Sequence, residues 1–242
     1  MLRIEGSPTR RVLVIDRPER ANALGLEEFH GLIEATDGLA RDPQVTSVVV
    51  RGSGAHFCAG IDLALLGQLA SAPRVEDVHA LQRAVLQLAL LEVPTMAAID
   101  GACIGAGLEL ALACDLRIAT ARSTFSLPEA RFGIVADLGG LSLTPEILGT
   151  ARALELALTT RRLSAKEAAQ VGLVHEVVED ASALDTRLQH VIAELEASPP
   201  DALRATKRLL LQQRRRRLEA DLADAAAATA GLLARHIETQ PR

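Results

Sequence analysis

Two stretches with the same plan constrain the fold of this chain more than any other feature. In each, an apolar, β-branched run is followed by small residues and then by a helical pattern: Val45 to Val50 leads into residues 55–63, and Thr95 to Ile99 leads into residues 100–110. Such runs are typical of strands buried in a parallel sheet. Small residues let the backbone approach a ligand closely, and a helix start presents free N–H groups. The pair therefore predicts two N–H groups aimed at one negative oxygen, an oxyanion hole.

The rest of the chain alternates strand and helix patterns before it becomes almost wholly helical from Thr150 onward. The alternation predicts an α/β fold of stacked ββα turns with crossover helices. Ser198-Pro199-Pro200 predicts a boundary between a core of residues 1–197 and a C-terminal helical region of residues 198–242. Within that region we expect two helices, over residues 200–213 and 214–236.

Composition excludes several classes of protein. The 242 residues are 49% hydrophobic, which is enough for a sizeable core, but only 2% are aromatic and the net charge is −5. Few aromatics and a negative charge argue against a nucleic-acid-binding role. An odd set of three cysteines without C-x-x-C spacing predicts reduced thiols in a cytoplasmic protein. The first residues show no signal-peptide pattern, and no apolar run is long enough to predict a membrane span.

Motifs for common cofactors are missing from the sequence. Gly105-x-Gly107 is followed by Leu110 where a dinucleotide fingerprint needs glycine, and there is neither a phosphate-binding loop nor a nucleophile elbow. The six histidines show no spacing typical of metal ligands. We therefore expect a protein without a metal ion or a redox cofactor.

The two stretches also resemble a known family. Residues 55–63 read A-H-F-C-A-G-I-D-L, and residues 100–115 read D-G-A-C-I-G-A-G-L-E-L-A-L-A-C-D. They resemble the paired motifs of the crotonase, or enoyl-CoA hydratase/isomerase, superfamily, and the resemblance extends from about Leu2 to Leu210. It implies a spiral of ββα turns, an acyl-CoA thioester substrate that brings its own coenzyme A, and a homotrimer or a hexamer of two trimers. It also implies that Ile61 and Ala106 supply the oxyanion N–H groups.

A third segment, residues 17–24, reads R-P-E-R-A-N-A-L and resembles the family's R-P-x-x-x-N-A-L, whose backbone lines the CoA adenine pocket in relatives. The alternative is an ordinary loop between a strand and a helix. Taken with the two turns, the resemblance implies a set of residues that bind the acyl-CoA. They are Ala21, Ala23, Leu24, Ala59, Gly60, Asp62, Leu63 and Gly105.

Two glutamates stand where hydratases of this superfamily hold a water molecule. Glu109 follows Ala106 by about one helical turn, and Glu129 lies in F-S-L-P-E-A-R-F-G, which resembles the family's F-x-x-P-E-x-x-x-G. Hydration of a 2-enoyl thioester puts charge on the thioester oxygen and needs a base for water and an acid for the α-carbon. Two carboxyl groups in different protonation states can supply both.

Asp137 departs from the hydratase pattern, which has glycine eight residues after the second glutamate. An acidic residue there resembles dienoyl-CoA isomerases and related double-bond isomerases, in which it moves a proton. The alternative is a helix N-cap before Leu138, a position that aspartate favours. We take Glu109, Glu129 and Asp137 as candidate catalytic residues and expect an enoyl-CoA hydratase. The alternatives are an enoyl- or dienoyl-CoA isomerase that uses Glu129 and Asp137, and a non-catalytic acyl-CoA-binding homologue, against which the two glutamates argue.

Overall fold

The structure is a computed structural model that describes residues 1–239, and a six-stranded sheet forms its centre. The strand order is β1-β2-β3-β4-β6-β9; β1 runs antiparallel to β2, and the other neighbours are parallel. The strands are β1 (Leu2–Gly6), β2 (Arg10–Ile15), β3 (Ser47–Gly52), β4 (Thr95–Ile99), β6 (Leu116–Thr120) and β9 (Glu176–Val178).

A second, three-stranded sheet receives the chain as it leaves the first. It contains β5 (Ala102–Ile104), β7 (Thr124–Ser126) and β8 (Leu163–Ser164), in that order. The chain passes from β4 to β5 and then into helix α4 (Ala106–Ala113), and from β6 to β7. The predicted α/β fold of ββα turns is thus confirmed. The sequence did not predict the second sheet, because strands of two or three residues are too short to show a periodic pattern.

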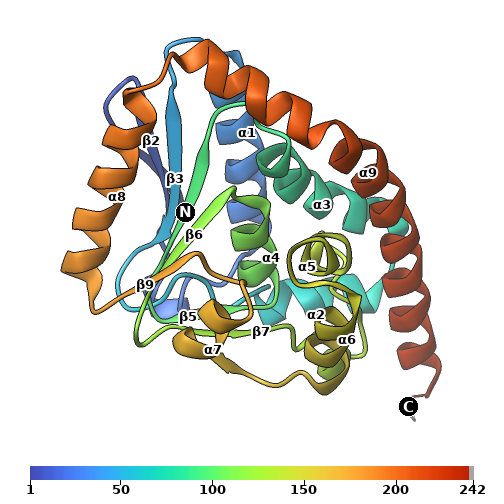
Figure 1. Ribbon diagram of the computed structural model, residues 1–242. Helices are drawn as coiled ribbons and strands as arrows, with labels where there is room; N and C mark the ends of the chain where they lie inside the picture. The colour runs from blue at the N-terminus through green and yellow to red at the C-terminus, as the bar shows by residue number, and fades with distance from the viewer. Residues whose placement is uncertain (240–242) are drawn as a thin grey trace.

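Helices cover both faces of the six-stranded sheet (Figure 1). Helix α8 (Ala181–Glu196) packs on one face, where Leu184 and Leu188 contact a cluster that includes Val49. Val48 and Val50 point to the opposite face and join the main core, to which α1 (Leu26–Arg41), α3 (Val75–Ala89) and α4 contribute. Side chains alternate between the faces of a strand. The continuous apolar run in β3 therefore reflects burial on both sides.

The last helix, α9 (Pro200–Thr239), is a single helix of 40 residues that curves over the molecule (Figure 1). The prediction of two helices was wrong, because the arginines that follow Gln213 favour helix and no proline or glycine interrupts it there. Lys207 ties α9 to the core, since its Nζ donates to Asp115 Oδ2 at 2.6 Å and to the Val93 carbonyl at 2.8 Å. Residues 240–242 of the expected C-terminal region lie outside the described residues.

The described part of the chain contains six further helices. They are η1 (Pro18–Arg20), α2 (Leu63–Ser71), η2 (Glu129–Phe132), α5 (Gly140–Leu148), α6 (Thr150–Thr159) and α7 (Ala165–Gln170). The sequence did not predict α5, which begins shortly after Asp137.

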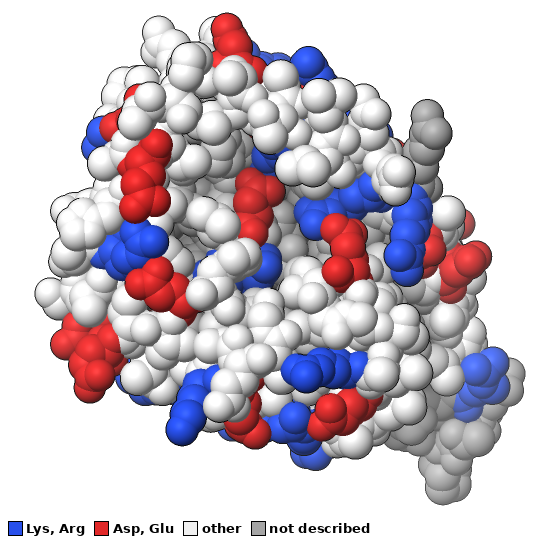
Figure 2. All heavy atoms as spheres, in the orientation of Figure 1, with Lys and Arg blue, Asp and Glu red and all other residues white. Residues whose placement is uncertain are grey.

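The surface carries charges of both signs. On the face seen in Figure 2, Lys and Arg side chains are interspersed with Asp and Glu. Exposed ion pairs such as Arg51–Asp185 at 2.8 Å contribute about 0–1 kcal/mol each, so the apolar core carries most of the stability. None of the helices described is both long and apolar enough to cross a membrane.

Candidate active site

The two glycine-rich turns lie side by side because a short parallel pairing joins them. The Cys58 N–H donates to the Ala102 carbonyl at 2.9 Å, and the Ile104 N–H donates to the Cys58 carbonyl at 3.0 Å. A similar pairing between Leu24 and Ile61 ties the first turn to residues 21–24. The three motifs that the sequence singled out therefore form one continuous surface.

Ile61 and Ala106 each expose a backbone N–H at this surface. Ala106 is the first residue of α4, and Ile61 lies just before α2. Within the described part of the chain, neither N–H donates to a backbone carbonyl. Gly60 makes their approach possible: its φ is +108°, and a Cβ there would lie 3.0 Å from the Ile104 carbonyl oxygen and 3.7 Å from the Ala106 nitrogen. This geometry suits an oxyanion hole, although the role of the two N–H groups stays a prediction.

A cavity of about 340 Å³, here called the outer pocket, opens in front of these N–H groups. Leu63 and Phe132 form an apolar mouth and are 65% and 48% exposed. Most of the predicted site residues line this pocket, namely Ala23, Ala59, Gly60, Ile61, Asp62, Leu63, Gly105, Ala106 and Glu129. The sequence analysis missed Arg20, Leu66, Pro128, Phe132 and Ile134.

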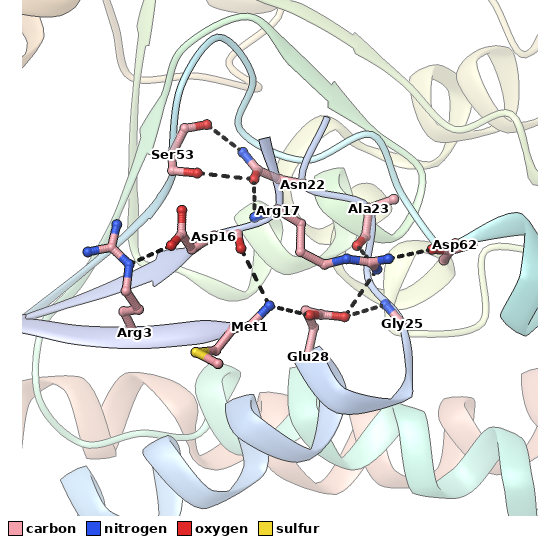
Figure 3. A network of polar contacts seen from close by, with 10 residues as sticks. All are labelled: Met1, Arg3, Asp16, Arg17, Asn22, Ala23, Gly25, Glu28, Ser53 and Asp62. Carbon is pink, nitrogen blue, oxygen red and sulfur yellow. Dashed lines mark hydrogen bonds and ion pairs between the residues drawn. The ribbon is translucent and has the colours of Figure 1, made fainter. Parts of the chain in front are cut away.

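Ala21 and Leu24 do not line the outer pocket but support its wall. The Ala21 carbonyl accepts a hydrogen bond from the Ala59 N–H at 3.0 Å, and Leu24 is fully buried. Asn22 holds the same loop: its side chain donates to the Ser53 carbonyl at 2.8 Å (Figure 3) and to the His56 carbonyl at 2.6 Å. The asparagine of the third motif therefore fixes the loop.

Asp62 lines the outer pocket, but its carboxylate is already occupied. One oxygen accepts from the Ala64 N–H at 2.9 Å and so caps α2, and the other accepts from Arg17 at 2.9 Å (Figure 3). Arg17 also donates to the Ala23 carbonyl. These bonds lower the pKa of Asp62, mainly through the Ala64 N–H, so its carboxylate stays charged and fixes the turn before α2.

Glu109 is buried in α4 and organises the start of α5. Its Oε1 accepts hydrogen bonds from the Leu138 N–H at 3.0 Å and from the Gly140 N–H at 2.8 Å. A Cβ at position 140 would lie 2.8 Å from that oxygen, so glycine is needed for this approach. Glu109 thus satisfies N–H groups that a helix start leaves free.

Asp137 is not the N-cap of α5. The N-cap residue is Gly139, and no side chain caps the helix from that position. The capping alternative from the sequence is therefore wrong, because Glu109 already satisfies the N–H groups at this helix start. The Asp137 side chain is instead 7% exposed and lines a second, smaller cavity. Its backbone carbonyl accepts from Gln82 at 2.7 Å, and Gln82 also donates to α9 at Leu222.

The smaller cavity, here called the inner pocket, has a volume of about 30 Å³ and adjoins the outer pocket. Glu109, Glu129 and Asp137 all line it, and Glu129 lines both pockets. Glu129 is 8% exposed, and its Oε2 has no hydrogen-bond partner within the described residues. Apolar side chains and one hydroxyl complete the lining: Ile61, Leu66, Leu69, Val78, Leu81, Ala106, Ile134, Leu138, Thr229 and Leu233.

The three carboxyl groups share an apolar enclosure that disfavours negative charge. Burial raises the pKa of Glu129 to about 7 and that of Asp137 to about 6. Burial, together with repulsion from the other two carboxyls, raises the pKa of Glu109 well above its usual range, despite the two N–H donors. All three pKa values therefore lie above their ordinary ranges, and those of Glu129 and Asp137 lie close to neutral pH. Such a pair can donate and accept a proton within one site.

The family follows from a match over almost the whole chain. Residues 10–238 match the family described as enoyl-CoA hydratase/isomerase. This protein belongs to that family. An enoyl-CoA hydratase from Bacillus halodurans has the same fold, with a TM-score of 0.91 and 27% sequence identity over 96% of this chain and 94% of that one. Membership in the enoyl-CoA hydratase/isomerase family confirms the resemblance seen in the motifs and implies that the protein binds an acyl-CoA.

Relatives within the family have names that refer to different reactions. The peroxisomal Delta(3,5)-Delta(2,4)-dienoyl-CoA isomerase of Arabidopsis thaliana is 37% identical over 214 residues, which cover 84% of this chain and 77% of the relative. The human mitochondrial methylglutaconyl-CoA hydratase is 33% identical over 235 residues, or 96% of this chain and 68% of the relative. Hydration and isomerisation both occur among these names, so the choice between them depends on the site.

Proposed function

We propose that this protein isomerises the double bonds of a dienoyl-CoA, moving a proton from C2 to C6 through Glu129 and Asp137. The observation that carries the proposal is the location of Asp137, whose side chain lines the inner pocket together with Glu129. The sequence favoured hydration, because a capping role explained Asp137 without chemistry. In the structure, Glu109 and not Asp137 accepts the hydrogen bonds from the N–H groups at the start of α5. Asp137 is thus available for proton transfer.

The first step is loss of a proton from C2 of a 3,5-dienoyl thioester. The C2–H bond breaks, its electron pair enters the conjugated system, and negative charge collects on the thioester oxygen. The N–H groups of Ile61 and Ala106 would stabilise that oxygen, and losing one such donor typically costs about 3–4 kcal/mol of barrier. Glu129 lines both pockets, and a Cβ at Gly105, the residue before Ala106, would lie 2.8 Å from its Oε1, so we assign Glu129 as the base at C2.

The second step is protonation at C6. A proton from Asp137 forms the C6–H bond, the double bonds settle at C2 and C4, and the thioester carbonyl is restored. Asp137 lines the inner pocket and does not line the outer pocket. C2 and C6 are four bonds apart, so two separate carboxyl groups suit this transfer better than one. The pair then exchanges a proton and returns to its starting state.

Glu109 has a supporting role in this scheme. Burial raises the pKa of Glu109 well above its usual range and so disfavours the ionised form that a base at either carbon requires. Its Oε1 holds the Leu138 N–H and the Gly140 N–H, on the C-terminal side of Asp137. Glu109 would therefore fix the segment that carries the proton donor.

Hydration of a 2-enoyl-CoA by Glu109 and Glu129, the reaction we expected from the sequence, is the second candidate. One observation favours it: both glutamates line the inner pocket, whose volume of about 30 Å³ could hold one water molecule. A non-catalytic acyl-CoA-binding protein is the third, and a site with three buried carboxyl groups argues against it, since such groups destabilise a fold unless they serve a function.

Mass spectrometry of the products tests the choice. The purified protein is incubated with 2-enoyl-, 3-enoyl- and 3,5-dienoyl-CoA esters, and each product is compared with its substrate. Isomerisation leaves the mass unchanged and converts the 3,5-dienoyl ester to the 2,4-dienoyl ester. A product from the 2-enoyl ester heavier by one water, with the 3,5-dienoyl ester left intact, would overturn the proposal in favour of hydration.

We also keep three expectations from the sequence as proposals. The assembly is a homotrimer or a hexamer of two trimers, which the exposed Leu158 and Leu210, at 74% and 76%, support as candidate contacts. The location is cytoplasmic, in keeping with three buried free cysteines. The chain divides into a core of residues 1–197 and a C-terminal helical region of residues 198–242.

A further inference from the structure

Helix α9 contributes one polar side chain to the inner pocket. Thr229 and Leu233 are the two residues of α9 that line it, and Thr229 is 3% exposed. Thr229 lies in the same small space as the carboxyl groups of Glu129 and Asp137, although it is far from both in the sequence. Nothing in the sequence indicated Thr229 as a site residue, because the residues around it show only a pattern typical of a helix.

The hydroxyl of Thr229 lacks the hydrogen bond that several other helical threonines make. Thr36, Thr159 and Thr186 each donate a hydrogen bond to the carbonyl four residues earlier, at 2.8, 2.7 and 3.0 Å. This bond to the preceding turn is the ordinary one for a threonine inside a helix. Thr229 does not make it, and its buried oxygen has no partner of normal geometry among the described residues. The donor thus remains available to the pocket.

Asp137 is the acceptor that faces this hydroxyl. Thr229 lies close enough to Asp137 to lower the pKa of that carboxyl, which burial raises. The titratable groups that also face Asp137 are Glu109 from α4 and Glu129 from η2, and each can donate to an ionised Asp137 only while it is itself protonated. Gln82 of α3 reaches only the Asp137 backbone. Thr229 is thus the hydroxyl donor placed for the ionised form of Asp137.

We infer that Thr229 is a positioning residue, whose hydroxyl donates to the Asp137 carboxylate and holds it toward the substrate carbon that receives the proton. The inference rests on the proposed isomerisation for its effect on rate, but the contact itself does not. A carboxylate that has just given up its proton in an apolar pocket needs a donor. The hydrogen bond would also favour the ionised form that Asp137 takes once it has given up its proton.

Four variants test this role. Thr229→Val removes the hydroxyl and keeps the branched shape of the side chain. Thr229→Ala removes both the hydroxyl and the branch, and Thr229→Ser keeps a hydroxyl. Thr144→Val is the matched control, because Thr144 is also a buried helical threonine without a hydrogen-bond partner, but it does not line either pocket. Carbon-13 NMR of labelled aspartate follows the Asp137 carboxyl through a pH titration in the full-length protein.

In Thr229→Val and Thr229→Ala the Asp137 titration should move upward by about one pH unit, as expected from the loss of a hydrogen bond to a charged group. With a 3,5-dienoyl-CoA, kcat should fall by roughly tenfold with KM unchanged, and the pH profile should move with the titration. Thr229→Ser should restore both, and Thr144→Val should match the parent.

An Asp137 titration that is the same in the parent and in both hydroxyl-free variants would overturn the inference. So would a loss of rate that Thr229→Ser does not reverse. Failure of the proposed function looks different: the parent would leave the dienoyl ester unchanged, while the titration would still decide whether Thr229 contacts Asp137.

Discussion

At the scale of single residues, the protonation of Glu129 and Asp137 controls the site. Their pKa values lie at about 7 and about 6, because burial opposes the charged forms. The two groups interact, so these values describe successive losses of protons from the pair. The pair holds one proton between those two pH values, and only then does it contain both a base and an acid. The proton lies mainly on Glu129, whose pKa is higher, and the proposed reaction starts from the arrangement in which it has moved to Asp137.

This predicts a bell-shaped pH dependence of kcat/KM for a 3,5-dienoyl-CoA, with its maximum between about pH 6 and 7. Below about pH 6 both carboxyls are protonated, so no base is present. Above about pH 7 both are ionised, so no proton can be delivered. Initial rates measured from pH 5 to pH 9 at constant ionic strength check this. A rate that is constant over the whole range would contradict it.

Asp137 should also reduce the stability of the fold. Its pKa is about 6 in the folded protein, against a reference value of 3.8, so the unfavourable charge develops as the pH rises from about 4 to about 6. Asp137→Asn should therefore raise the free energy of unfolding by about 1–3 kcal/mol at pH 8 and change it little at pH 4. Urea denaturation at both pH values measures this difference.

Asp100→Asn is the control of opposite sign. Burial raises the pKa of Asp100, but hydrogen bonds from Arg122 and Thr120 outweigh it, and the pKa is lowered. This variant should destabilise the protein at pH 8, because the ionised carboxylate is the form that the fold favours. If Asp137→Asn changed the free energy of unfolding equally at pH 4 and pH 8, the environment of Asp137 would not disfavour its ionised form.

At the scale of secondary-structure elements, the starts of helices build the site. Ala106 is the first residue of α4, Asp62 caps α2, and Glu109 holds the start of α5. The strand-turn-helix order of the first two was predictable from the sequence, because their motifs are contiguous. The role of Glu109 at α5 was not predictable, because it depends on the packing of two elements that are 31 residues apart at Gly140.

Replacing Ala106 by proline tests the oxyanion hole at its helix. Proline removes the N–H but fits the first position of a helix, so the fold should persist. Gly105, the residue before the new proline, has φ +55° and ψ −127°. These angles are the mirror image of the extended conformation that residues before proline prefer, and glycine can adopt them. Turnover should fall by about 10²- to 10³-fold, whereas Ile61→Ala, which keeps its N–H, should be mild. Near-normal turnover in a folded Ala106→Pro variant would exclude this donor.

The same scale shows where prediction from sequence stops. The strand β4 was predictable from the sequence, because the apolar run Thr95 to Ile99 identifies it. The strands β5, β7 and β8 pair with each other in the second sheet, and nothing in the sequence of any one of them indicates this pairing. Thr229 and Gln82 reach the site through the packing of α9 and α3, which a local pattern cannot encode.

At the scale of the whole molecule, apolar side chains remain exposed. Leu154 and Leu158 lie one turn apart on α6, and Leu209 and Leu210 lie on α9, all more than half exposed. Exposed leucines of this kind are typical of surfaces that another chain covers. We therefore predict a trimer, or a hexamer, of the 25.7 kDa chain in light scattering at micromolar concentration. A monomer mass under these conditions would contradict the prediction.

The choice of reaction is also a property of the whole site. The sequence identified all three carboxyl groups, but it could not divide the roles among them, because that division depends on which one holds the start of α5. The relatives named as hydratases and as isomerases match this chain almost equally well. A comparison of the three residues in one assay assigns the role of each carboxyl group in the reaction.

The most direct test compares Asp137→Asn, Glu129→Gln and Glu109→Gln with a 3,5-dienoyl-CoA as substrate. We predict that Asp137→Asn and Glu129→Gln each lose about 10²- to 10⁴-fold in kcat, the usual range for general acid–base groups. Glu109→Gln should stay within about tenfold of the parent, because the glutamine oxygen can still accept from the Leu138 and Gly140 N–H groups. Near-parental activity in Asp137→Asn, with collapse of Glu109→Gln and a water adduct of a 2-enoyl-CoA formed by the parent, would contradict the account.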